Sequence, residues 1–512
     1  MFIFEIRIAK EFSSKQPKNR EYGINMGVLS NLINIPFVAK TVLKAYKKNA
    51  FKPFRVPLQE AFEKQERTLK TKLEKLAKTN IGKKMGAHRN LKLKDLPITD
   101  YSFYETFYNN PKPQDFMFPL KDYVRIKTSG TAGKEKVYLR PRQKVLTSFM
   151  ETGVPAFFAA FHDGDKITLN YGDNFYVNMG PAPFAAGSTF SLVSKEKKVP
   201  FFNIIPNVNL PYNDKVRYFI SNHEKIDGAI MLASTLICQV MPAIGKPIKL
   251  KGLLMPDTPE VEMYMEDIRE FTGVTPRTAY ASTETIACSI PSVQHTLGFI
   301  FDLRRGVYEF APTEKSDEDQ QYLPLNEVTV GQTYRLIYTD LESEITRFDT
   351  KDAVKCIAYG DDILETDYPI FKFQARTDKT ISLHNFTRID EEELITVMRE
   401  AKIPFVEFTA KLESEQGHEY LSIYIELGEK ENQEKFQNKL HQQLTKTDED
   451  YQNLTNYFDY IPLKTYIVPK GTFAKYLEQK EGSMAKVDRI NMREEEFAKL
   501  SKLMEITAKN DQ

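Results

Sequence analysis

GAIMLAS, at residues 228–234, is the first of three short apolar runs that decide the fold class, and KGLLM at 251–255 and RTAYAS at 277–282 follow it. Apolar runs of this length are typical of buried strands. The segments between them, around residues 235–244 and 259–272, have the composition and length of helices. Because strands that alternate with helices pair in parallel through right-handed crossovers, we predict an α/β unit here. Its ligands are expected at the carboxyl ends of the strands.

The flanking sequence predicts further elements and a separate C-terminal unit. An apolar stripe of helical period between residues 58 and 77 predicts a packed helix. GVYEFAP and QTYRLIYTD, after residue 306, alternate as antiparallel strands of a half-buried sheet do. VEFTAKLE, EYLSIYIEL and EKENQEKFQNKLHQQL predict a small α+β unit, and the charged tail from residue 494 a helix.

The predicted fold class is therefore α/β. We expect a large N-terminal domain at residues 1–374, with mixed and parallel sheets flanked by helices, and a small α+β domain at residues 375–512.

Length and charge narrow the class of function. A chain of 512 residues exceeds what one core usually serves, so it has room for the substrate pocket of an enzyme. The 71 Lys and Arg residues nearly balance the 70 Asp and Glu residues, which leaves no global field that favours nucleic acid or an anionic membrane. The uncharged stretch at residues 22–39 contains polar residues and a proline, so we predict a buried or amphipathic helix and no stable membrane insertion.

The cysteines and histidines indicate neither a disulfide framework nor a transition-metal site. Cys238, Cys288 and Cys356 lie far apart, and no two of the seven histidines have a metal-binding spacing. We therefore expect a reducing cytoplasm. The first residues do not resemble a secretory signal, and Met26 is an alternative start.

A loop-like stretch, TSGTAGKEK at residues 128–136, has the composition of a phosphate-binding segment. Its small residues allow backbone amides to approach oxygen atoms, its hydroxyls donate hydrogen bonds, and its lysines supply charge. It does not fit the nucleotide-binding pattern GxxxxGK[ST], because Lys134 is followed by Glu135 and the glycine spacing differs. The alternative is an ordinary turn between two strands.

Three stretches together resemble the signatures of the adenylate-forming enzymes, the superfamily of acyl-CoA synthetases, adenylation domains and luciferases. They are TSGTAGKEK, YASTE at residues 280–284 and RFDTKD at residues 347–352, in the superfamily's order and roughly its spacing. The alanine of YASTE, the stretch EVTVGQTYRLIYTDLESEITRFDTKD at 327–352 and PITDYSFYE at 97–105 most resemble the acyl-acid amido synthetases, which include plant auxin- and jasmonate-conjugating enzymes and prokaryotic relatives. The resemblance spans roughly residues 59–489.

The resemblance implies ATP and Mg²⁺ as cofactors and assigns a role to each stretch. Lys136 would add charge at the pyrophosphate end of ATP, Thr283 would bond the α-phosphate, and Glu284 would hold Mg²⁺. The plainer alternatives are a solvated lysine and a surface glutamate. The remaining residues implied around the phosphates are Thr128, Ser129, Gly130, Thr131, Gly133 and Ser282.

The base and the sugar would be bound by the other two stretches. Tyr280 would stack on adenine, although a buried core tyrosine is the alternative. Asp352 would accept hydrogen bonds from the ribose, with Asp349 as a competing partner. Lys351 departs from the family's glycine, which puts the local turn in doubt. Arg347 would face phosphate or pair with one of these aspartates.

In the small domain, AKVDR at residues 485–489 resembles the Lys-x-x-Arg end of the superfamily, so Lys486 would stabilise charge during adenylation. The implied reaction joins a carboxylic acid to an amine, an amino acid in the family, through an acyl-adenylate. A hinge at residues 376–379 would let the small domain serve both half-reactions. Two alternatives stay open, namely an acyl-CoA ligase and a nucleotide-binding protein without turnover.

Overall fold

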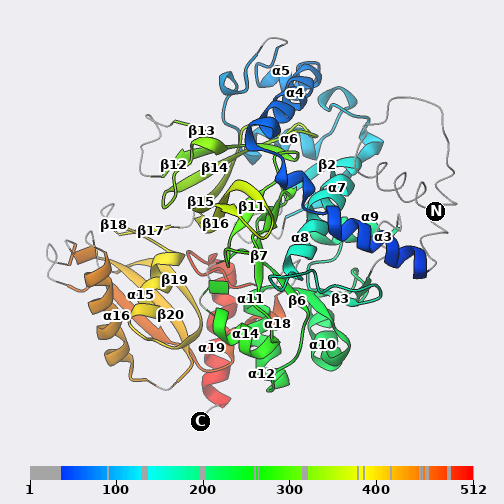
Figure 1. The fold of residues 1–512 in the computed structure, drawn as a ribbon. Coiled ribbons are helices and arrows are strands. Elements are labelled where there is room, and N and C mark those ends of the chain that lie inside the picture. Colours follow the sequence, from blue (N-terminus) through cyan, green and yellow to red (C-terminus); the bar gives the residue numbers. More distant parts are fainter. Residues whose placement is uncertain are drawn as a thin grey trace, which may run out of the picture.

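The computed structural model describes residues 36–510, except 89–90, 129–135, 196–201, 259–260, 263, 314–320, 377–379, 384–386, 416–417, 430, 449–450, 453, 456–459 and 481–485. Figure 1 shows an antiparallel sheet with β12, β14 and β15 above a parallel sheet with β3 and β6, and a C-terminal unit to one side. The helix predicted at residues 22–39 lies outside the described residues except for its last four, which begin α3 (Pro36–Asn49). Within the described ranges, no helix has the length and apolarity that a membrane crossing needs.

The central α/β unit is confirmed. Its five strands pair only in parallel, in the order β4-β3-β5-β6-β7. The first apolar run forms a strand only at its start, because α11 begins at Ala233. The elements are β3 (Asn174–Val177), β4 (Asn203–Ile205), α10 (Tyr212–Asn222), β5 (Gly228–Ile230), α11 (Ala233–Thr235), the π-helical turn η7 (Leu236–Val240), α12 (Met241–Ile244), β6 (Gly252–Pro256), α14 (Met265–Thr272) and β7 (Arg277–Ala279).

Aromatic side chains pack on both faces of this sheet. Phe175 and Tyr176 are neighbours in β3 and point to opposite faces, as residues of a strand do. Phe175 lies 4.7 Å from Phe157 of α8 (Val154–Ala160), and Tyr176 lies 4.8 Å from Phe219 of α10, both measured between ring centroids. Helices therefore cover both faces, which is the usual arrangement of a parallel sheet.

The antiparallel sheet joins β12 (Gly306–Pro312) to β14 (Thr333–Asp340), with Gly306 opposite Asp340, as the alternation predicts. Its order is β10-β11-β16-β15-β14-β12-β13. The other strands are β10 (Ser289–Pro291), β11 (Phe299–Phe301), β13 (Leu323–Pro324), β15 (Phe348–Asp361) and β16 (Thr366–Arg376). The half-buried character predicted for this sheet is wrong for β14, which is buried at every residue from Leu336 to Asp340.

Polar side chains that reach this sheet explain its burial. Gln65 of the confirmed helix α4 (Leu58–Leu76) donates to the Gly306 carbonyl at 2.8 Å, and Lys72 donates to the Ile345 carbonyl at 2.6 Å. Both side chains are buried because they continue the apolar stripe of the helix, between Phe62, Leu69 and Leu76 at helical spacing. Because each finds a carbonyl acceptor, the helix covers the sheet without leaving these donors unsatisfied.

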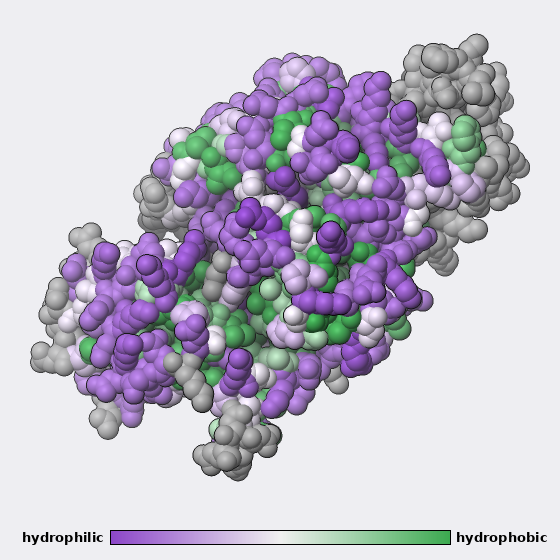
Figure 2. Space-filling model, turned by 60° about the horizontal axis from the view of Figure 1, so that its bottom comes forward, coloured by the Kyte–Doolittle hydropathy of each residue, from purple (hydrophilic) through white to green (hydrophobic). Residues whose placement is uncertain are grey.

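The C-terminal unit has the predicted elements. β19 (Phe405–Glu415) and β20 (His418–Leu427) pair antiparallel, and β21 (Leu463–Ile467) joins β20 in parallel. The helices are α15 (Glu391–Glu400), α16 (Gln433–Thr447), α18 (Thr472–Gln479) and the tail helix α19 (Glu494–Asn510). Phe473 and Tyr476 of α18 share an apolar cluster with Leu236 and Val240 of η7. Figure 2 shows hydrophobic residues gathered along the middle of a mostly hydrophilic face, beside the C-terminal unit. The boundary near residue 375 stays a prediction.

Carboxylates gather where α15 meets β16. Phe373 donates its backbone N–H to Asp257 at 2.6 Å, and Lys372 pairs with Glu262 at 2.6 Å. Burial raises the pKa of Glu392, on α15, to about 7, and Asp390 adds to this while Lys372 opposes it. This contact between α15 and the sheet is therefore sensitive to pH near neutrality.

Glycine at position 228 is required by close packing, and its replacement tests the fold. A Cβ atom there would lie 1.9 Å from the Phe161 ring, so we expect Gly228→Ala to lower the free energy of unfolding by about 1–3 kcal/mol in denaturant titrations. In the matched control Gly428→Ala, the nearest atom to the new Cβ is 3.6 Å away, and no such loss is expected. Equal effects of the two substitutions would contradict this packing.

The carboxylate of Glu392 predicts a loss of stability with rising pH. A pKa raised above the ordinary value near 4.3 means that ionisation is harder in the folded protein, so stability is lost as the pH rises through about 7. Between pH 6 and pH 8, the thermal midpoint should fall more in wild type than in Glu392→Gln. The exposed control Glu505→Gln, on α19, should follow wild type, and identical pH profiles for all three proteins would refute the assignment.

Candidate active site

The first signature stretch closes a β-hairpin. β1 (Tyr123–Lys127) and β2 (Val137–Pro141) pair antiparallel. Thr128 and Lys136 continue the pairing, because the Thr128 N–H donates to the Lys136 carbonyl at 2.9 Å and the Lys136 N–H donates to Thr128 Oγ1 at 3.1 Å. Lys136 is exposed, with its ammonium 5.2 Å from the Tyr101 ring centroid. Ser129, Gly130, Thr131 and Gly133 lie outside the described residues.

The second stretch forms a tight turn directly after the carboxyl end of β7, the edge predicted for ligands. β8 (Ala281–Ser282) pairs with β9 (Ile286–Ala287), and the Ser282 N–H donates to Thr285 Oγ1 at 2.9 Å. Thr283 and Glu284 occupy the turn and are half-buried. Glu284 Oε1 accepts a hydrogen bond of 2.6 Å from the Tyr138 hydroxyl on β2. The strand that follows the first stretch is therefore in direct contact with the second stretch through this bond.

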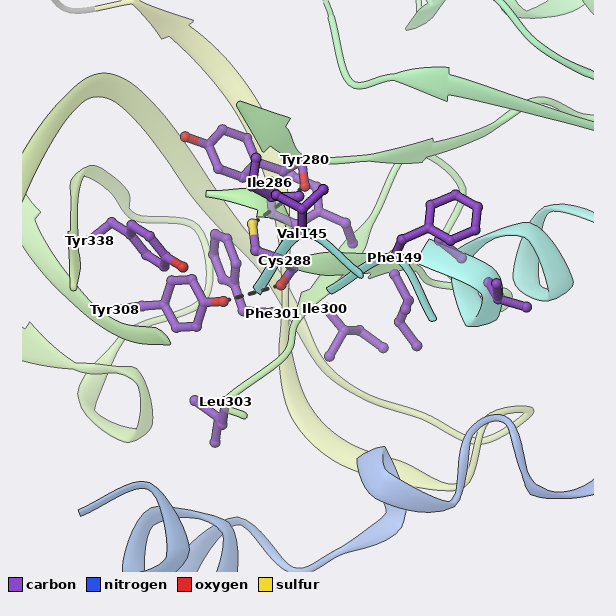
Figure 3. Packing of buried hydrophobic residues seen from close by; sticks show 14 of the residues in the cluster. Val145, Phe149, Tyr280, Ile286, Cys288, Ile300, Phe301, Leu303, Tyr308 and Tyr338 are labelled. Atoms are coloured by element: carbon purple, nitrogen blue, oxygen red, sulfur yellow. Dashed lines mark hydrogen bonds between the residues drawn. The ribbon is translucent and has the colours of Figure 1, made fainter. Parts of the chain in front are cut away.

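The second and third stretches also meet. The Tyr280 hydroxyl donates to Asp352 Oδ2, on β15, at 2.7 Å. The Tyr280 ring is 5% exposed and stacks on Phe299, with centroids 5.7 Å apart. Burial, with Asp352 next in weight, raises the pKa of Tyr280 well above 10, so the hydroxyl keeps its proton. Figure 3 shows Tyr280 near Ile286 and Cys288 in the packed cluster.

Arg347 of the third stretch has another partner than the predicted aspartates, and Lys351 adopts the conformation that a glycine would. The Arg347 guanidinium pairs with Glu309 at 3.0 Å and donates to the Leu96 carbonyl at 2.7 Å, so neither predicted aspartate is its partner in these contacts. Lys351 has φ 61°, in the left-handed region that favours glycine. The turn is thus kept despite the lysine, and its ammonium pairs with Asp349 at 2.5 Å.

Lys486 lies in the segment between α18 and α19. Its carbonyl accepts a hydrogen bond from Lys480 Nζ at 2.7 Å, and the next residue, Val487, packs in the cluster shared with η7. These contacts give its location, and its role in adenylation stays a prediction.

The sequence did not indicate Tyr138 or the buried ion pairs that fix its strand. Arg140 of β2 pairs with Asp340 of β14, and Lys144 lies 3.3 Å from the same carboxylate. All three side chains are fully buried. Although burial alone would raise it, Lys144 and Arg140 lower the pKa of Asp340 to about 2. One feature of the sequence could have revealed these ion pairs. Arg140 stands inside the apolar strand KVYLRP, and a buried arginine needs a partner of opposite charge.

One carboxylate in the candidate site fits the way proteins hold Mg²⁺ with ATP. Within the described part of the chain, no three His, Cys, Asp or Glu side chains gather into a metal-binding group. Proteins usually bind Mg²⁺ through one or two carboxylates together with substrate phosphates, and the half-buried Glu284, bonded to Tyr138, fits that mode.

The backbone conformation of Lys351 predicts an unusual response to substitution. Lys351→Gly should leave the free energy of unfolding within about 1 kcal/mol of wild type, because relief of the left-handed conformation offsets the lost ion pair and the entropy of glycine. Lys351→Val should lower it by about 1–2 kcal/mol. At Lys355 of the same strand, where φ is not positive, valine should be tolerated better than glycine. The same order at both positions would contradict this conformation.

Two parts of the sequence match family models. Residues 299–376 match the GH3 family central domain and residues 392–494 match the GH3 family C-terminal domain. No curated protein matches the sequence significantly. The fold is shared with AtGH3.15 acyl acid amido synthetase in complex with 2,4-DB, at 13% identity and TM-score 0.68, over 89% of this chain and 95% of that chain.

The fold is also shared with 2-hydroxyisobutyryl-CoA ligase in the postadenylation state with 2-HIB-AMP, at 13% identity and TM-score 0.62, over 89% of this chain and 94% of that chain. At these identities the solved structures show the fold. Together with the two family models they confirm the resemblance found in the sequence, which is to the adenylate-forming superfamily near the acyl-acid amido synthetases.

Proposed function

We propose that this protein is an ATP-dependent ligase that activates a carboxylic acid as an acyl-adenylate and transfers the acyl group to an amine, in particular that of an amino acid. The observation that carries the proposal is that the second and third stretches meet each other, and that the strand following the first stretch meets the second. Tyr138, two residues after the first stretch, bonds Glu284, and Tyr280 bonds Asp352. Neither contact is local, so the fold itself brings these residues to one edge of the parallel sheet.

Each stretch has a part in binding ATP. Asp352 binds the Tyr280 hydroxyl through Oδ2, and because a carboxylate accepts several hydrogen bonds it would also accept from the ribose hydroxyls. The Tyr280 ring would contact adenine at its rim, since stacking on Phe299 buries most of it. Glu284 is bonded to Tyr138 of β2, and the phosphates would bind near this contact, at Glu284 and the Thr283 hydroxyl. Mg²⁺ bound with ATP would neutralise phosphate charge there.

The chemistry consists of positioning and charge neutralisation. A carboxylate oxygen of the acid attacks the α-phosphorus of ATP, and the bond to pyrophosphate breaks. The amine then attacks the acyl carbon, loses a proton, and AMP leaves. The hydroxyls of Thr128 and Thr283 and the ammonium groups of Lys136 and Lys486 would stabilise the charge on phosphate oxygens in the first step.

The three buried free cysteines suit a reducing cytoplasm, which we propose as the location.

An acyl-CoA ligase is the second candidate. The observation in its favour is the fold shared with 2-hydroxyisobutyryl-CoA ligase over nearly the whole chain. Its first half-reaction is the same, and only the acceptor differs. The third reading, a nucleotide-binding protein without turnover, rested on Lys351, and the retained turn at that residue argues against it. Mass spectrometry of the product formed with an amino acid and CoA both present would distinguish an amide from a thioester.

The proposal predicts ATP–pyrophosphate exchange with a suitable carboxylic acid. Across a panel of acids, at least one should support exchange, and Glu284→Ala and Asp352→Ala should each suppress it roughly 100-fold, or about 2.7 kcal/mol. Asp349→Ala is the matched control, because Asp349 is held by Lys351 and should matter less for the ribose. Exchange that is unaffected in both test variants would rule out the assigned site.

A further inference from the structure

Tyr138 contacts the second and third signature stretches and lies two residues after the first. It follows Lys136 by two residues on β2, its hydroxyl donates to Glu284 at 2.6 Å, and its ring lies 6.5 Å from Phe348, which follows Arg347 in the third stretch. The side chain is fully buried. Tyr138 is held in β2 by its backbone and in the core by its ring. Its hydroxyl is therefore well placed to fix the position of Glu284.

We infer that Tyr138 is a positioning residue that orients the Glu284 carboxylate toward Mg²⁺. The inference rests on the proposed function. The hydrogen bond engages Oε1, so the second oxygen of the carboxylate is presented to the cation in a defined direction. Because Glu284 is in a turn and half-buried, its side chain would otherwise sample several rotamers and lose entropy on binding the ion. Residues behind a metal ligand commonly tune affinity in this way.

The surroundings of Tyr138 hold its ring in place. The ring packs against Tyr101 at 5.2 Å and Tyr108 at 5.6 Å, measured between ring centroids. On the same strand, Arg140 pairs with Asp340, which ties β2 to β14 of the antiparallel sheet.

Tyr138→Phe tests the inference, because it removes the donor and keeps the ring and its packing. Mn²⁺ binding in the presence of ATP, followed by electron paramagnetic resonance, and the Mg²⁺ dependence of ATP binding, followed by calorimetry, are the readouts. We expect the concentration of metal at half-saturation to rise about tenfold, as the loss of a hydrogen bond to a charged group predicts. The rate of ATP–pyrophosphate exchange by Tyr138→Phe at saturating Mg²⁺ should change little. A general destabilisation of the fold would instead lower this rate at every metal concentration.

Tyr108→Phe is the matched control. Tyr108 is equally buried in the same aromatic cluster, and its hydroxyl has no hydrogen-bond partner among the residues that the structure describes. Removal of this hydroxyl should leave the metal dependence unchanged. In a Glu284→Ala background, Tyr138→Phe should cause no further shift, because alanine removes the acceptor through which Tyr138 acts. This double variant also detects a role of Tyr138 in stability alone, which would appear equally in both backgrounds.

The outcomes separate this inference from the proposed function. An unchanged metal dependence in Tyr138→Phe, with wild type still active in exchange, overturns the inference and leaves the ligase proposal standing. An equal shift in Tyr108→Phe overturns it as well, because cluster packing would then be the cause. Absence of Mg²⁺-dependent ATP binding and of exchange in wild type overturns both proposals together.

Discussion

The hydrogen bond from Tyr138 to Glu284 is the contact on which the candidate site depends, because it joins a hairpin strand to a turn that follows the parallel sheet. The two residues are 146 positions apart, so no local preference brings them together. Each belongs to an element that other contacts hold rigidly. With the bond between Tyr280 and Asp352, it joins β2, the turn after β7 and β15, as the proposed nucleotide site requires.

Buried charges stabilise this arrangement at some energetic cost. Arg140, Lys144 and Asp340 are removed from water, and desolvation of such groups is repaid only when their geometry is good and their donors are satisfied. The Ser343 hydroxyl accepts from the Arg140 guanidinium at 3.1 Å, which adds to the pairing. Apolar residues in these positions would give a core of similar volume, but they would not tie β2 to β14, which belongs to a different sheet. We attribute the network to this positional requirement.

Much of the fold follows from local patterns in the sequence. The alternation of apolar runs and helical segments between residues 228 and 282 sufficed for the parallel sheet, and period-two alternation sufficed for β12 and β14. The burial of the antiparallel sheet was not predictable in this way. It depends on Gln65 and Lys72, polar residues of α4 that find carbonyl acceptors on a sheet more than 230 positions away.

The candidate site was predictable by residue type more than by contact. Tyr280, Glu284 and Asp352 were identified from their stretches, but the partner of Arg347 was not, because Glu309 reaches it from another strand. A crystal structure with Mg²⁺ and a non-hydrolysable ATP analogue tests the central claim most directly. The account predicts the base beside Tyr280, the ribose at Asp352 and the phosphates between Glu284 and residues 128–136. A nucleotide bound elsewhere, or touching only one of these segments, would contradict it.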